Sequence, residues 1–127
     1  MSSSAGVSAA AQKAIQVALS KLGTPYVWGG SGPNVFDCSG LTSYAARAAG
    51  VNIPRTADKQ YQDLPKVNPA DIRPGDLIFP DSEFNNGSPG HVMMYIGNGK
   101  CVEAPHTGDY VKVISLPSSF HASRWTS

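Results

Sequence analysis

Cys38 is the residue of this chain whose type and position best suit chemistry. It lies in the segment FDCSGL, between a glycine-rich loop and a stretch with helical spacing. The positive end of a helix dipole favours the thiolate, which is the nucleophilic form of cysteine, so a cysteine in the first helical turn is a candidate nucleophile. The alternative is a small buried hydrophobic residue, which is the more common fate of a single cysteine.

A nucleophilic cysteine needs a base, and the chain offers His91, His106 and His121. His91 opens a predicted strand directly after a glycine-containing loop, where a neighbouring group has room. His106 follows Pro105 in a loop, and we interpret His121, in the C-terminal tail, as a surface residue. Each histidine taken singly is more often structural or solvent-facing than catalytic, and His91 has the most favourable setting of the three.

The third member of such a site accepts the other imidazole N–H, and Glu103 and His106 compete for this role. The length of the loop around Gly97-Asn98-Gly99 distinguishes them. A three-residue loop puts Glu103 on the face of His91, one diagonal step away. A two-residue loop puts His106 opposite His91 and turns Glu103 to the other face, because side chains alternate along a strand.

The two loop lengths differ in the first pair of the hairpin. The longer loop pairs Ile96 with Lys100, and the shorter one pairs Gly97 with Lys100. Three-residue loops favour glycine at a left-handed position, and Gly99 supplies it. We therefore predict the longer loop, with Glu103 as the third residue. The alternative is a solvent-facing glutamate on an alternating strand.

The elements that must position these residues change from helical to strand spacing along the chain. Helices are predicted over residues 9–22, 37–49 and 56–64, the second with Asp37 as its N-cap. Strands are predicted over residues 76–79, 91–96, 100–104 and 110–116. Loops are predicted over residues 24–36 and 80–90. Helices followed by antiparallel strands indicate the α+β class.

The composition bounds the function. A chain of 127 residues, 41% of them hydrophobic, fits one domain with a real core. The net charge of +1 shows no basic surplus, so a nucleic-acid partner is not expected. We find no apolar run of about 18 residues, so no membrane span is predicted. We predict a flexible leader over residues 1–8, without the features of a secretory signal, and one domain over residues 9–127.

Five segments in order resemble the New lipoprotein C (NlpC) family of bacterial cell-wall cysteine peptidases. They cover most of residues 10–117 and read PYVWGG, FDCSGL, PRTADKQ, RPGDLIF and GHVMMYIGNGK. Each segment is weak alone, and the five together at plausible spacing are highly specific. The resemblance implies a papain-like fold, in which the helix that carries the nucleophile packs on an antiparallel sheet that carries the histidine.

The same resemblance implies roles for individual residues. Cys38 would be the nucleophile, His91 the general base and then the general acid, and Glu103 the third polar residue. The family often has histidine at that third position, and glutamate would favour a thiolate–imidazolium pair. Tyr26, in PYVWGG, matches a tyrosine near the oxyanion. Met93 stands where the family commonly has glycine, two residues after the histidine, and we expect it either to narrow the groove or to alter the packing behind it.

Three further positions match family residues near the substrate. Asp37 and Ser39 flank the nucleophile, where such residues help to hold the free amino end of a stem peptide. Asp37 therefore has two interpretations, helix cap and substrate anchor, and both can hold. Arg55, in PRTADKQ, matches a position near the groove and is a possible substrate contact. Cys101 is expected to be a free, buried thiol.

The resemblance implies a peptidoglycan endopeptidase that cleaves stem peptides between γ-D-glutamyl and a diamino acid such as meso-diaminopimelate. No metal or organic cofactor is expected, because no paired cysteine or histidine spacing supports a zinc site. A monomer is expected, acting outside the cell or in the envelope as part of the full-length protein. The alternatives are an amidase or acyltransferase on the same fold, and a catalytically idle cell-wall-binding module.

Overall fold

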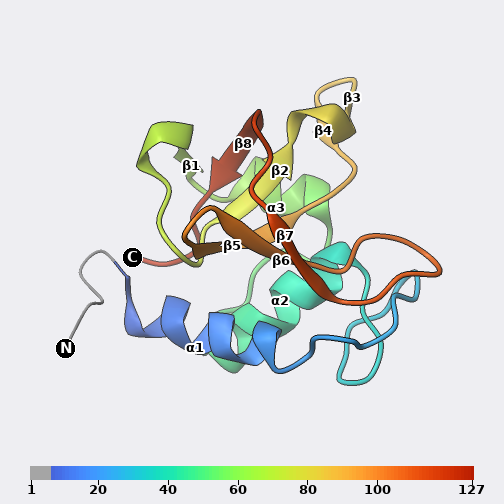
Figure 1. The fold of residues 1–127 in the computed structure, drawn as a ribbon. Helices are drawn as coiled ribbons and strands as arrows, with labels where there is room; N and C mark the ends of the chain where they lie inside the picture. The colour runs from blue at the N-terminus through green and yellow to red at the C-terminus, as the bar shows by residue number, and fades with distance from the viewer. Residues whose placement is uncertain (1–6) are drawn as a thin grey trace.

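A computed structural model describes residues 7–127, in which three helices are followed by a six-stranded antiparallel sheet (Figure 1). The helices are α1 (Ala9–Leu19), α2 (Cys38–Ala48) and α3 (Ala57–Asp63), with 3₁₀ turns η1 (Pro69–Asp71) and η2 (Asp81–Glu83). The main sheet contains β1 (Lys66–Val67), β2 (Leu77–Pro80), β5 (Met93–Gly97), β6 (Lys100–Glu103), β7 (Lys112–Ser115) and β8 (Phe120–Ser123), in the order β1-β8-β2-β5-β6-β7. The predicted α+β class is confirmed.

Side-chain caps explain where the helices begin. Ser8 accepts the N–H of Ala11 at the start of α1, and Asp37 and Thr56 cap α2 and α3 in the same way. Residues 1–6 of the predicted leader lie outside the described residues, and Ser8 belongs to the cap of α1. None of the helices within residues 7–127 has the length and apolarity needed to cross a membrane.

The first helix ends three residues before its predicted end. Beyond Leu19 the chain forms a tight turn whose N–H groups reach back three residues rather than four. Gly23 then adopts φ +86° and donates its N–H to the carbonyl of Val111. Leu22, expected on the buried face, is 48% exposed, because this tie to the sheet side of the molecule draws the chain away from the helix axis.

The alternation of side chains along the strands divides the core into two clusters. On the helix side, α2 lies against β5, and the sheet buries Leu77, Phe79, Val92, Met94 and Val102 there. The opposite side holds a smaller cluster of Ile78, Met93, Cys101 and Ala122. The expected packing role of Met93 is thus in this second cluster, and Cys101 is free and buried as predicted.

The C-terminal tail is a strand inside the sheet. β8 pairs with both β1 and β2, and no strand was predicted after residue 116. Its sequence, Phe-His-Ala-Ser, alternates apolar and polar residues, but four residues without a β-branched side chain give a weak strand signal. His121 is more than half exposed as expected, and it also contacts Asp81 at 2.7 Å.

The predicted surface loop over residues 80–90 contains a small hairpin, β3 (Phe84–Asn85) and β4 (Ser88–Pro89). Asn86 and Gly87 join the strands, both with positive φ, as a type I′ turn requires. The Asn-Gly pair is the sequence signal for this turn. The hairpin leads the chain back toward His91.

A buried ion pair fastens the chain end beyond β8 to the strand that precedes the site. Asp76, 2% exposed, accepts two hydrogen bonds from Arg124, each 2.8 Å long. We expect Arg124→Met to lower the free energy of unfolding by about 3 kcal/mol, because it leaves a buried carboxylate without its partner. Urea denaturation measures this, with Arg73→Met, at an exposed position, as the control. Equal stability of the two variants would contradict the role of the pair.

Candidate active site

Cys38 is the first residue of α2, as predicted, and Asp37 is its N-cap. The Asp37 carboxylate accepts the N–H of Gly40 at 2.7 Å, so the prediction that it caps this helix is confirmed. The first N–H groups of a helix have no partner within the helix, and their partial positive charge favours an anion. The thiol is partly exposed, because Cys38 packs against the main core cluster and also lines a hollow.

The turn between β5 and β6 is shorter than predicted. Gly97 pairs with Lys100 across Asn98 and Gly99, which have φ values of 53° and 71°. Positive φ at both central residues is the pattern of a two-residue type I′ turn, and Asn-Gly favours it. The predicted three-residue loop is therefore wrong at this point.

A β-bulge between Tyr95 and Gly97 compensates for the shorter turn. It inserts one extra residue into β5, after which Met94 pairs with Val102. That pairing is the one that the longer loop would have produced, so the strands bring Glu103 to the face of His91. The predicted choice of Glu103 over His106 is confirmed as a contact, since His91 Nε2 lies 2.7 Å from Glu103 Oε1.

The imidazole of His91 carries a strong preference for the charged form. Burial lowers its pKa, but hydrogen bonds to Cys38 and Glu103 outweigh that effect and raise it to about 9. Because Glu103 occupies Nε2, the nitrogen left for the sulfur is Nδ1. His91 is therefore protonated at neutral pH, which suits a thiolate–imidazolium pair.

Tyr26 lies on the other wall of the same hollow as Cys38. Burial, together with the negative charges of Cys38 and Asp37, raises the pKa of its hydroxyl, and Arg55 offsets part of this effect. The phenol therefore keeps its proton and can donate a hydrogen bond. Its backbone N–H donates to the carbonyl of Asp109, which ties the loop to the segment before β7.

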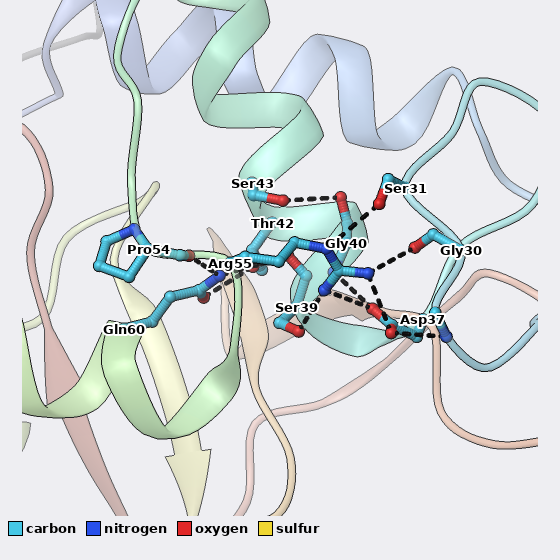
Figure 2. A network of polar contacts seen from close by, with 11 residues as sticks. Gly30, Ser31, Asp37, Ser39, Gly40, Thr42, Ser43, Pro54, Arg55 and Gln60 are labelled. Atoms are coloured by element: carbon cyan, nitrogen blue, oxygen red, sulfur yellow. Dashed lines mark hydrogen bonds and ion pairs between the residues drawn. The ribbon is translucent and has the colours of Figure 1, made fainter.

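Arg55 joins the residues on both sides of the nucleophile (Figure 2). Its guanidinium donates to Ser39 Oγ at 2.8 Å and to Asp37 Oδ2 at 3.1 Å. It also donates to Ser31 Oγ and to the carbonyl of Gly30. The predicted substrate residues Asp37, Ser39 and Arg55 therefore lie together beside Cys38, in contact with one another.

The sequence did not single out Gln60, which supports this network from below. Gln60 is fully buried and accepts a hydrogen bond from the hydroxyl of Thr42 at 2.8 Å. Its amide donates to the carbonyls of Ser39 and Pro54, as Figure 2 shows. It thereby fixes α3 to the first turn of α2. Gln60 ends the segment PRTADKQ, and nothing in that sequence indicates that its amide is buried.

The remaining candidates lie away from the sulfur. His106 is largely exposed and contacts Asp109, and His121 lies beside Asp81. Burial raises the pKa of the Cys101 thiol to about 12, with a smaller contribution from Glu103. Across residues 7–127 there is no group of three or more histidine, cysteine, aspartate or glutamate side chains placed to hold a metal ion.

Two hollows flank the contact between Cys38 and His91. One, of about 480 Å³, is lined by Tyr26, Cys38 and the residues around Arg55. The other, of about 530 Å³, is lined by His91 and Glu103. Gly90 borders both of them. An extended ligand that crosses Gly90 therefore passes the sulfur and the imidazole in turn.

A cysteine at the N-terminus of a helix, packed on an antiparallel sheet that supplies histidine and an acid, defines a papain-like fold. The chain belongs to the NlpC/P60 family, whose model matches residues 23–127. Two solved structures are similar. A family member from Bacillus cereus has a TM-score of 0.82 at 33% identity, covering 91% of this chain and 40% of that one. The P60 domain of the Mycobacterium avium subspecies paratuberculosis antigen MAP1204 has 0.81 at 33%, covering 93% and 96%.

Curated relatives are also similar in sequence. Murein DD-endopeptidase MepH of Escherichia coli K12 is 40% identical over 117 residues, or 86% of this chain. A Listeria seeligeri protein named "Probable endopeptidase p60" is 43% identical over 105 residues, or 82% of this chain. The chain spans 43% of the first protein and 18% of the second.

The Glu103 carboxylate is expected to keep His91 charged. In Glu103→Gln the pKa of His91 should fall below about 9, because the hydrogen bond stays while its negative charge is lost. NMR titration of the His91 ring protons measures this shift, and Glu83→Gln, at an exposed carboxylate, is the control.

The pH dependence of the free energy of unfolding should also reflect the pair of His91 and Glu103. A raised pKa in the folded state stabilises the protein fully below the unfolded value of about 6.5, and this contribution is lost as the pH rises toward 9. The wild-type free energy of unfolding should therefore decline over that interval more steeply than that of Glu103→Gln. Identical slopes would contradict the assignment.

Proposed function

We propose that this domain is a peptidoglycan endopeptidase that cleaves stem peptides between γ-D-glutamyl and a diamino acid such as meso-diaminopimelate. The observation that carries the proposal is the buried pair of His91 and Glu103, 2.7 Å apart, with Cys38 at the start of α2 as the other hydrogen-bond partner of the imidazole. Family membership supports it, as do relatives named as endopeptidases.

Cys38 is the nucleophile, and His91 and Glu103 are its partners. The thiolate attacks the scissile carbonyl and forms a C–S bond, and the carbonyl oxygen becomes an oxyanion. The C–N bond then breaks, and the His91 imidazolium donates its proton to the leaving amine. Water next attacks the thioester, with neutral His91 accepting its proton, and the acid product leaves with the thiolate restored.

Tyr26 is the oxyanion residue. Its hydroxyl and the backbone N–H of Cys38 are the two donors, one from the loop and one from the start of α2. The raised pKa of Tyr26 supports this role, because a donor must keep its proton. The reaction needs no metal or organic cofactor, because the chain supplies the nucleophile, the proton carrier and the oxyanion donors.

The two hollows correspond to the two sides of the scissile bond. The leaving amine takes its proton from His91, so the leaving diamino acid occupies the hollow lined by that residue. The acyl part, bound to the sulfur, occupies the hollow with Asp37, Ser39 and Arg55 in its wall. The partner is thus the stem peptide, and the domain acts as a monomer on the cell wall, in the envelope or outside the cell.

We expect Cys38→Ala to abolish cleavage of purified stem tripeptides and tetrapeptides, because no other group in the site can form the acyl-enzyme. Mass spectrometry of the products measures cleavage and identifies the bond. Cys101→Ala is the matched control and should retain activity, since that thiol is buried and its pKa is high. Cleavage by the Cys38 variant at the wild-type rate would contradict the mechanism.

Mass spectrometry of the products from intact, cross-linked muropeptides distinguishes the alternative functions, because purified stem peptides contain neither the cross-link nor the bond to the glycan. The relative named murein DD-endopeptidase favours a second candidate, cleavage between two D-centres of a cross-link. Separation of the cross-linked stems with both γ-D-glutamyl–diamino acid bonds intact would indicate that bond, and fragments that end in γ-D-glutamate the proposed one. An amidase would release intact stem peptides. A wall-binding module without turnover would bind peptidoglycan and leave Cys38 inert toward iodoacetamide.

We expect Tyr26→Phe to lower kcat by about 100-fold with little change in KM, because one oxyanion donor is lost while the ring remains. Steady-state kinetics on the cleaved stem peptide measures both constants. Tyr110→Phe, at an exposed tyrosine whose segment pairs with Pro25, is the control. An unchanged kcat in Tyr26→Phe would remove this residue from the oxyanion site.

A further inference from the structure

The guanidinium of Arg55 donates most of its hydrogen bonds within the protein. A guanidinium has five N–H groups. Four hydrogen bonds lead to Ser31, Ser39, Gly30 and Asp37, and Nη1 also lies 3.1 Å from the second oxygen of Asp37. Four of the five N–H groups are thus hydrogen-bonded within the protein, and Nη1 is also in an ion pair with Asp37. A substrate that contacted this side chain through more than one N–H would have to displace one of these bonds.

The acceptors of Arg55 belong to two separate parts of the site. Gly30 and Ser31 lie in the loop that follows Tyr26, and Asp37 and Ser39 flank Cys38 on α2. We propose that Arg55 is a positioning residue, which holds the Tyr26 loop against the nucleophile helix and thereby sets the geometry of the oxyanion site. This proposal rests on the proposed function.

The backbone is closely packed where the Tyr26 loop meets α2, so the position in which Arg55 holds the loop affects the helix as well. A Cβ on Gly40 would lie 1.9 Å from the carbonyl oxygen of Gly30. The same carbonyl accepts the N–H of Asp37 at 2.9 Å as well as the bond from Arg55. The turn from Val27 to Gly30 is closed by its own hydrogen bond of 2.8 Å. A displacement of Gly30 is thus passed directly to the residues next to Tyr26.

Arg55 also supplies charge. Asp37 is buried apart from 13% of its side chain, and it stands next to the nucleophile. Without a cation beside it, its negative charge would disfavour the Cys38 thiolate. Lysine keeps a positive charge but lacks the planar fork that reaches several acceptors at once. Substitution by lysine therefore separates the geometric contribution of Arg55 from its electrostatic one.

The test compares turnover with thiol alkylation in Arg55→Lys. We expect kcat on the cleaved stem peptide to fall by about 10- to 100-fold with KM nearly unchanged, because the oxyanion donors are misplaced. The rate and pH dependence of iodoacetamide alkylation should stay at wild-type values, because alkylation needs the thiolate but no oxyanion site. Arg47→Lys, at the exposed end of α2, is the matched control.

A second variant, Ser31→Ala, removes one acceptor on the loop and keeps the charge of Arg55. It should lower kcat in the same direction by a smaller factor, again without change in alkylation. If Arg55→Lys does not fold, this variant tests the positioning role in its place.

A raised KM with preserved kcat in Arg55→Lys would overturn the positioning role in favour of a substrate contact. Wild-type kinetics in both variants would overturn it as well. A wild-type domain that cleaves no stem peptide would instead overturn the proposed function, and the positioning role would fall with it.

Discussion

The Asp37 carboxylate is the interaction on which the site depends. It caps α2 through Gly40, accepts the N–H of Gly29 at 3.0 Å and pairs with Arg55. A carboxylate offers about four acceptor positions, and these contacts use them. One group thus fixes the start of the nucleophile helix, the loop before it and the segment after it. No apolar or neutral side chain of the same size could satisfy these donors and the guanidinium together.

The charged groups around Cys38 form two pairs with different roles. Asp37 and Arg55 neutralise each other, so the residue before the nucleophile adds little net repulsion to a thiolate. Glu103 and His91 form a buried pair whose effect is to keep the imidazole protonated, against the burial that would remove its proton. The first pair is structural and the second acts on the proton that the reaction moves. The near-neutral net charge of the chain is compatible with this chemistry, because the electrostatic field at the site comes from a few positioned residues.

The elements that depend on local sequence signals were predicted, and the features that depend on contacts between distant residues were missed. The caps Asp37 and Thr56 and the glycine that follows α2 are signals within a few residues, so α2 and α3 were predicted closely. β8 was missed because the alternation in Phe-His-Ala-Ser is too short to predict a strand, and pairing on both sides fixes it in the sheet. The bulge near Tyr95 has no side-chain signature. Glu103 was chosen correctly although the loop was assigned the wrong length, since the bulge cancels that error.

The hydrogen bonds of Arg55 cannot be predicted from a sequence motif, because their acceptors are distant along the chain. Its acceptors lie 16 to 25 residues away in sequence, so nothing around PRTADKQ reveals how many donors remain free. A family motif places an arginine near a groove, and both a substrate contact and a scaffold bond fit that position. The four hydrogen bonds that Arg55 donates to the loop and to the residues beside Cys38 favour the scaffold bond. The charges of Asp37 and Arg55 in the groove wall beside Cys38 are therefore balanced within the protein, before any substrate binds.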